Sequence, residues 1–134
     1  RRPAAGSSWP GGGVGVRQRG EAGPGAAAAW VRPARPRGAG GMRTALRRAL
    51  AAADFGNGVS AALPWGEFRF INTDLTVYLH RQPEGEWVCL DAATVVESRG
   101  IGLAQSQLYD ERGPVGRSLQ ALFIDRVSTA PPRM

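Results

Sequence analysis

The sequence has no lysine, one cysteine and one histidine among its 134 residues. One cysteine cannot form a disulfide within the chain, nor a cysteine-based zinc site. One histidine likewise excludes a histidine-based metal set, so we predict no metal site. No apolar run reaches the roughly 18 residues that a membrane helix needs, and we expect no membrane partner. The length fits one domain with a modest core.

The charge is unevenly distributed along the chain, and all 17 basic residues are arginine. Residues 1–48 hold ten arginines and one acidic residue, a net charge of +9, whereas residues 49–134 hold seven arginines and ten acidic residues, a net charge of −3. A chain that uses only arginine and is rich in alanine and glycine is typical of biased codon usage. The basic segment therefore does not predict a nucleic-acid partner.

Composition divides the chain into a tail and a domain. Glycine, proline and alanine fill 25 of the first 41 positions, which leaves too little apolar surface to offset the entropy of ordering. We predict a disordered tail over residues 1–24, a single domain over residues 25–128 and a short C-terminal tail over residues 129–134. Prolines on both sides of residues 26–32 restrict that segment to a short first strand.

The segment from Met42 to Leu63 predicts one long helix that ends at Pro64. Its apolar stripe recurs at helical spacing, with Leu46, Ala49, Leu50 and Ala53 on one face. Gly56 and Gly58 interrupt it, and each costs about 1 kcal/mol in a helix interior. We therefore expect something to pack close to the main chain at these two glycines.

After Pro64 the apolar pattern changes to a period of two, which indicates strands. Four strands are predicted, over residues 68–80, 86–98, 101–111 and 115–126, with short turns between them. Such turns indicate an antiparallel meander. The order of one strand, one helix and four strands predicts an α+β fold, in which the antiparallel sheet wraps around the helix.

Three reactive or titratable residues receive a structural interpretation. Cys89 alternates with Trp87 on a strand, and we interpret it as a buried, inert thiol. His80 is interpreted as a sheet-surface residue rather than a base. Asp110 lies at a hairpin end with Glu111 and Arg112, and is most simply part of a solvated turn.

Three other polar residues lie in or beside apolar strands. Asp74 opens a strand, where its carboxylate either caps main-chain amides or takes part in chemistry. Gln120 lies between apolar neighbours and must either face solvent or find partners, because a buried unpaired amide costs about 1–3 kcal/mol. Thr94 is also a polar residue inside an apolar strand, and the same two alternatives apply to it. Spacing alone does not decide between structural and catalytic roles for these three.

The run from Phe70 to Arg81, followed by Gly85-Glu86-Trp87-Val88, resembles the C-terminal half of type II acyl-CoA thioesterases and their actinobacterial relatives. An Asp-x-x-x-x-x-His-Arg motif, a Glu-Trp pair, a glycine-led hairpin at Arg112-Gly113 and the triplet Ser118-Leu119-Gln120 occur in the order seen in that family. Residues 51–58 resemble the central helix of these relatives. The resemblance covers about residues 43–126.

This resemblance implies the hot-dog fold, an antiparallel sheet wrapped around one long helix. It implies a cytoplasmic hydrolase of fatty acid metabolism that needs no cofactor and takes a CoA thioester as its substrate. Asp74 and Gln120 match the family's aspartate and glutamine, and Thr94 the hydroxyl, that together hold a water against the thioester carbonyl. Gly56 and Gly58 would let an acyl chain or a partner's main chain pass close to the helix. CoA phosphates would be bound by arginine, with Arg81 and Arg117 as candidates.

The family's enzymes carry two hot dogs with the acyl-CoA site between them, whereas the resemblance covers one. We therefore expect a second hot-dog domain as partner, supplied by a homodimer or by a missing N-terminal half, and activity that depends on it. A non-catalytic hot dog that binds an acyl group or another subunit is the alternative. A hot-dog dehydratase is a second alternative, although its chemistry relies on an Asp/His pair and Asp54 has no histidine beside it.

Overall fold

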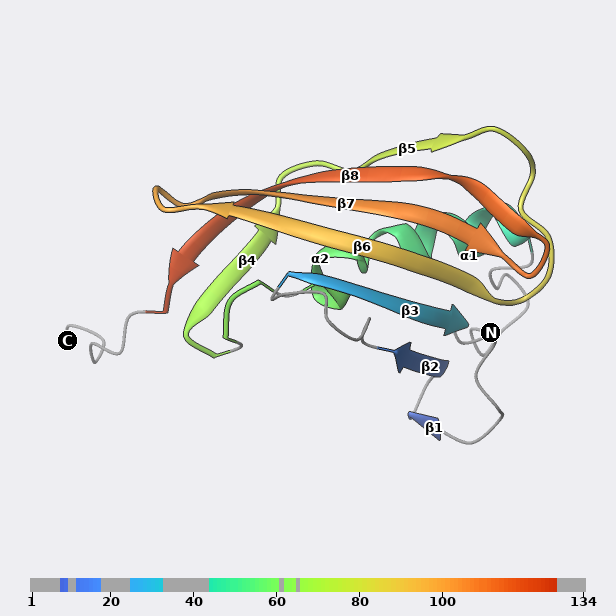
Figure 1. Cartoon of the computed structure of the whole chain (residues 1–134), viewed down its shortest axis with the longest axis horizontal. Helices are drawn as coiled ribbons and strands as arrows, with labels where there is room; N and C mark the ends of the chain where they lie inside the picture. The colour runs from blue at the N-terminus through green and yellow to red at the C-terminus, as the bar shows by residue number, and fades with distance from the viewer. Residues whose placement is uncertain are drawn as a thin grey trace.

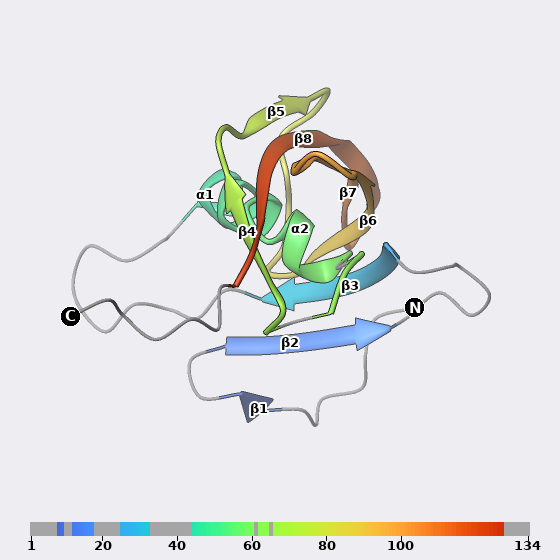
Figure 2. The same cartoon turned by 90° about the vertical axis from the view of Figure 1, so that its left-hand side faces the viewer.

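A curled antiparallel sheet with two short helices on its inner face forms the described part of the chain (Figure 1). The computed structural model describes residues 8–9, 12–17, 25–32, 44–60, 62–64 and 66–127. The strands are β1 (Ser8–Trp9), β2 (Gly12–Arg17), β3 (Ala26–Arg32), β4 (Phe68–Asn72), β5 (Thr76–Leu79), β6 (Val88–Glu97), β7 (Ile101–Asp110) and β8 (Gly113–Arg126), and the helices are α1 (Ala45–Ala53) and α2 (Gly56–Val59). The strand order is β1-β2-β3-β6-β7-β8-β4, and β5 also pairs with β8. Viewed end-on, the sheet curves around the helices (Figure 2).

The long strands β6, β7 and β8 form three strands of the predicted antiparallel meander. The strand predicted over residues 68–80 is instead divided into β4 and β5, and both pair with β8 rather than with the next strand, β6. Their side chains alternate between the inner and outer faces, and the inner residues Leu90, Leu108 and Leu122 are almost fully buried. The β6–β7 turn needs Gly100, whose φ of 89° lies in the left-handed region that favours glycine. The α+β architecture and the first strand at residues 26–32 are thus confirmed.

The helical region differs from the single long helix that the sequence predicts. It is divided into α1 and α2, because the chain turns at Asp54 and Phe55 before the glycine-containing second segment. The apolar stripe is also only partly covered: Ala49 and Ala53 are buried, whereas Leu46 and Leu50 are 37% and 40% exposed. The small alanines allow α1 to approach the sheet closely, which turns the two leucines outward.

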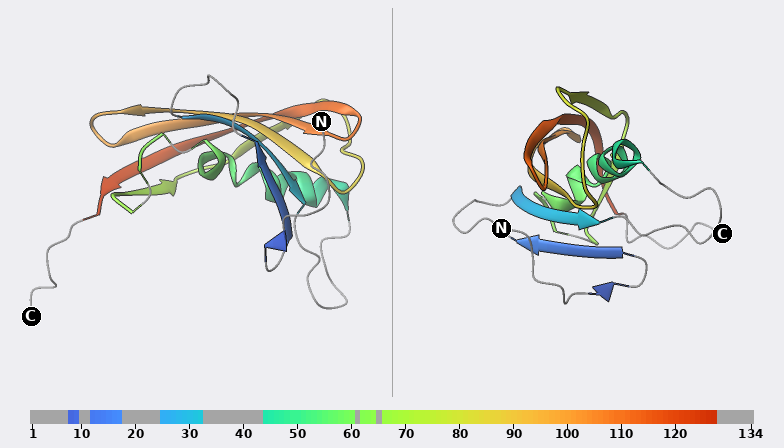
Figure 3. Two further views of the ribbon diagram at one scale, coloured as in Figure 1. Left: turned by 60° about the horizontal axis from the view of Figure 1, so that its bottom comes forward. Right: turned by 90° about the vertical axis from the view of Figure 1, so that its right-hand side faces the viewer.

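Two strands, β1 and β2, occur within residues 1–24, the segment for which composition predicts disorder. They continue the sheet beyond β3, away from the helices (Figure 3). A strand edge pairs through main-chain groups, whose hydrogen bonds depend little on side-chain type, so composition is a weak guide here. The remainder of residues 1–24 and the predicted tail at 129–134 lie outside the described residues.

The core consists of two apolar clusters with polar side chains between them. The first gathers α1 and the start of β6 around Leu90 and Leu108, and the second gathers Ala104, Leu122 and Ile124. Between them, where α2 crosses the sheet, lie five buried polar side chains that we call the polar belt: Ser60, Thr94, Ser106, Ser118 and Gln120. A polar belt within a core needs internal hydrogen bonds, and it is the natural place to look for a site.

Candidate functional site

The edge of the sheet beside β8 is interrupted at Asp74. On one side of the gap Asn72 of β4 pairs with Leu122, and on the other Thr76 of β5 pairs with Leu119. In the gap, the Ala121 N–H donates to Asp74 Oδ1 at 2.7 Å. The carboxylate thus takes the place of a main-chain carbonyl in the ladder, which is the capping role considered for this residue.

The remaining oxygen of Asp74 is open to chemistry. The residue is exposed, and its Oδ2 has no hydrogen bond within the described part of the chain. A carboxylate that is anchored through one oxygen is held in a fixed orientation and keeps the other as a proton acceptor. Structural capping and acid–base chemistry are therefore compatible at this position.

Gln120 points inward from β8 and is only 1% exposed. Its Oε1 accepts from the Asn57 N–H at 3.2 Å, and its Nε2 donates to the Asp54 main-chain oxygen at 3.1 Å. One end of the amide is thus bonded to the end of α1 and the other to the start of α2. Of the two arrangements that the sequence allows, a partnered inward amide is the one found.

The two glycines of α2 behave differently. A Cβ at Gly56 would lie 2.8 Å from Ser106 Oγ and 2.9 Å from Gln120 Oε1, so this position must stay without a side chain for α2 to reach the sheet. Gly58 is exposed, and a Cβ there would meet nothing within 4 Å. The close approach expected at Gly56 is made by side chains of the sheet itself.

Two asparagines that the sequence analysis did not single out complete this cluster. Asn57 Nδ2 donates to Asn72 Oδ1 at 2.5 Å, and Asn72 Nδ2 donates to Asp54 Oδ1 at 3.1 Å. We call Asp54, Asn57, Asn72 and Gln120 the helix-break network. Its only signal in the sequence was an asparagine between two glycines and another at a strand end, each of which also occurs in ordinary turns.

Thr94 lies in the same polar belt and is 7% exposed. Its Oγ1 is 2.6 Å from Ser60 Oγ, which in turn donates to the Gly56 main-chain oxygen at 2.9 Å. A hydroxyl carries one proton, so the Thr94 hydroxyl donates to Ser60. Thr94 therefore braces the end of α2.

The three residues expected to hold a water are thus distributed over two places. Gln120 and Thr94 both contact α2 from inside the sheet, whereas the hydrogen bond of Asp74 goes to the β8 main chain one residue after Gln120. Within the described residues no hydrogen bond joins the three side chains directly. Their joint role in catalysis stays a prediction.

Arg81 and Asp110 form an ion pair in which the Asp110 side chain is buried and that of Arg81 is 30% exposed. Arg81 donates from Nη1 and Nη2 to the two carboxylate oxygens at 2.7 Å each, and from Nε to the Pro114 carbonyl. Burial raises the pKa of Asp110, but the hydrogen bonds from Arg81 and from the Glu84 and Arg112 amides outweigh it and lower that pKa to about 2. The solvated turn predicted at Asp110 is therefore wrong, because its side chain is fully buried. With its guanidinium occupied in this way, the phosphate-binding role of Arg81 stays a prediction.

The other reactive groups agree with their structural interpretation. Cys89 is buried, and burial together with the charge of Asp91 raises its pKa to about 11. His80 is exposed at the end of β5. Among the residues that the structure describes, no group of three or more His, Cys, Asp or Glu could hold a metal ion, and no helix is long and apolar enough to span a membrane.

Solved structures with this architecture include three thioesterases. Acyl-CoA thioesterase II TesB2 from Mycobacterium marinum superposes with a TM-score of 0.64 at 16% identity, over 98% of this chain and 57% of that protein. Thioesterase HI1161 from Haemophilus influenzae gives 0.62 at 14% identity, over 88% and 82% of the two chains. A thioesterase family protein from Silicibacter pomeroyi gives 0.61 at 17% identity, over 84% of each. These likenesses confirm the hot-dog fold, with two short helices where one long helix was expected.

Family comparison agrees with the residues on which the resemblance rests. A comparison with curated protein sequences gives no match. Residues 2–124, however, match the family described as "Acyl-CoA thioesterase C-terminal domain", a range that contains Asp74, Thr94 and Gln120. The substrates of this family are CoA thioesters. Because the match covers most of the chain, this protein belongs to the acyl-CoA thioesterase C-terminal domain family.

Proposed function

We propose that this chain hydrolyses an acyl-CoA thioester at the break between β4 and β5, with Asp74 as general base. The observation that carries the proposal is the anchored carboxylate, with Oδ1 held by the Ala121 N–H and Oδ2 open. Asp74 takes a proton from a water, the hydroxide forms a bond to the thioester carbonyl carbon, and the carbon–sulfur bond then breaks. The CoA thiolate leaves and is protonated. Positioned proton transfer of this kind contributes about 10²–10⁴-fold in rate.

Gln120 and Thr94 support this water in the proposal. The orientation of the Gln120 amide is set by its two bonds to the turn at Asp54 and Asn57, which leave the second Nε2 hydrogen without an acceptor in the described chain. That hydrogen would bind the water. Thr94 holds the end of α2 through Ser60 and so keeps Gln120 in place. Groups fixed before the substrate arrives lower the barrier by reducing reorganisation.

A second hot-dog domain completes the site in this proposal. Leu46 and Leu50, one helical turn apart on α1, leave an apolar stripe exposed. A second copy of this chain, or another hot dog, would cover that stripe and place its own groups opposite Asp74. A cytoplasmic role in fatty acid metabolism stays a prediction.

Replacing Asp74 by asparagine tests the proposal, because asparagine keeps an Oδ1 that accepts from Ala121 and removes only the base. We expect thiol release from a panel of acyl-CoAs to fall at least about 100-fold, with little change in melting temperature. Asp125→Asn, an exposed carboxylate on β8, is the matched control and should keep full activity. An Asp74→Asn variant that turns over as fast as the parent would refute the assignment.

A non-catalytic acyl-binding domain is the second candidate. It is favoured by one observation. Gln120 and Thr94 are buried, and each already has a hydrogen-bond partner beside α2, which is Asp54 for Gln120 and Ser60 for Thr94. Two results together would favour the binding domain over the hydrolase. The chain would bind a non-hydrolysable acyl-CoA analogue, and it would release no thiol in any oligomeric state seen by native mass spectrometry.

A further inference from the structure

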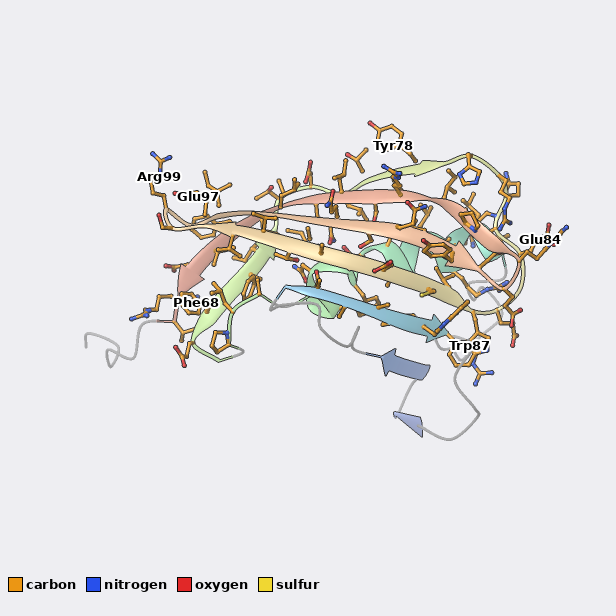
Figure 4. All side chains as sticks on the ribbon, in the orientation of Figure 1. Phe68, Tyr78, Glu84, Trp87, Glu97 and Arg99 are labelled. Atoms are coloured by element: carbon orange, nitrogen blue, oxygen red, sulfur yellow. The ribbon has the colours of Figure 1, made fainter. Side chains whose placement is uncertain are left out.

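A groove of about 800 Å³ crosses the outer face of the sheet. Ser118 points inward, so its strand neighbours Arg117 and Leu119 point to the opposite face. The groove is lined from five strands, β3, β5, β6, β7 and β8, and Tyr78 of β5 stands beside it on the face away from the helices (Figure 4). Its volume lies within the range of small-molecule sites, about 300–1,000 Å³.

Arg117 is held in this groove by a neutral partner. It pairs in register with Gln107, whose Oε1 accepts from Arg117 Nε at 2.9 Å. Gln107 is fixed in turn, because its Nε2 donates to the Gly116 carbonyl at 2.9 Å. This neutral partner orients the guanidinium without cancelling its charge, and no hydrogen bond of the two Nη groups is seen among the described residues. The groove also contains one carboxylate, Asp91, which pairs in register with Gln107 on the side away from Arg117.

The other arginines of the sheet hairpins contrast with Arg117. Arg81 is paired with Asp110, Arg112 with Glu84 and Arg99 with Glu97. A carboxylate partner cancels the charge that an anionic ligand would seek. Arg117 is thus the hairpin arginine whose cationic fork is both oriented and available.

We propose that the groove binds the phosphate-bearing nucleotide end of CoA, with Arg117 as the phosphate ligand. A guanidinium fork matches phosphate oxygens in geometry and charge. Tyr78, opposite Arg117 in register and 65% exposed, offers an aromatic face for the adenine base. His80 adds a ring nitrogen, and Leu119 adds apolar surface. The naming of CoA rests on the proposed function.

The groove and the reaction site lie within reach of one CoA molecule. Asp74 precedes Tyr78 by four residues, so their Cα atoms are at most about 14 Å apart. The extended pantetheine arm of CoA covers that distance. A nucleotide in the groove would therefore deliver its thioester to the break between β4 and β5.

Calorimetric titration of the full chain with free CoA, with pantetheine and with inorganic phosphate tests the proposal without needing turnover. We expect CoA to bind more tightly than either fragment, and Arg117→Gln to weaken CoA binding at least tenfold while pantetheine binding stays within twofold. Gln107→Ala keeps the charge but releases the guanidinium, and should weaken CoA binding by a smaller factor. Arg99→Gln makes the same charge change at an exposed turn and should leave CoA binding unchanged.

Three results would overturn the proposal: no CoA binding to the parent chain, Arg117→Gln binding CoA like the parent, or phosphate binding as tightly as CoA. The outcome is separable from that of the proposed function. CoA binding that depends on Arg117 in a chain without hydrolysis would leave the groove assignment standing. If the chain hydrolyses acyl-CoA and Arg117→Gln does not change the KM, the proposed function holds and the proposed CoA site in the groove is wrong.

Discussion

Replacing Asp110 by asparagine removes the acceptor on which two loops converge. The carboxylate accepts from both Nη groups of Arg81 and from the main-chain N–H groups of Glu84, Arg112 and Gly113. Asparagine offers one oxygen, and its NH2 group would face donors. Removing one partner of a fully buried ion pair costs about 3–5 kcal/mol. Because Arg81 is 30% exposed and water can solvate it, we expect Asp110→Asn to lower the free energy of unfolding by less, about 2–3 kcal/mol.

The same pair predicts how stability depends on pH. The pKa of Asp110 is lowered from 3.8 to about 2, a difference worth about 2.4 kcal/mol of stability. Because the folded-state value lies below the unfolded one, this contribution is fully present above about pH 4 and is lost as the pH falls towards about 2. The asparagine variant should lack that part of the acid profile.

Urea unfolding followed by tryptophan fluorescence at pH 7 and pH 3 measures both effects. Asp125→Asn, at an exposed position, serves as control and should change stability by less than about 0.5 kcal/mol. A loss below about 1 kcal/mol in Asp110→Asn, or an acid profile identical to that of the parent, would show that the pair does not hold the loops together.

Two further predictions concern buried positions, one in α2 and one in β6. Gly56→Ala should lower the free energy of unfolding by about 1–3 kcal/mol, since the added Cβ meets Ser106 and Gln120; an unchanged urea midpoint would contradict the close packing of α2. Cys89, with its pKa raised to about 11 by burial and by the charge of Asp91, should resist a thiol reagent at pH 8 in the native chain and react fully in denaturant, whereas rapid native labelling would contradict its burial.

Local pattern was enough to predict most of the fold. The alternation of apolar residues in β6, β7 and β8 and the short turns between them are properties of neighbouring residues, so they can be recognised without knowing the rest of the chain. The helix was predicted too long because its apolar stripe continues across Gly56 and Gly58, while the break depends on how α2 meets the sheet. Strands β1 and β2 escaped prediction because their pairing with β3 depends on a free edge.

The candidate site was predictable as a set of residues but not as an arrangement. Sequence alone determined that Asp74, Thr94 and Gln120 were polar groups in apolar surroundings whose burial would demand partners. Only the tertiary structure decided those partners, because Gln120 meets Asp54 across 66 residues and Asp74 meets Ala121 across 47. Register within a hairpin follows from the local apolar pattern and the turn. The pairing of β4 and β5 with β8 and the packing of α2 against the sheet join segments that are far apart in the chain, so the spacing of neighbouring residues does not reveal them.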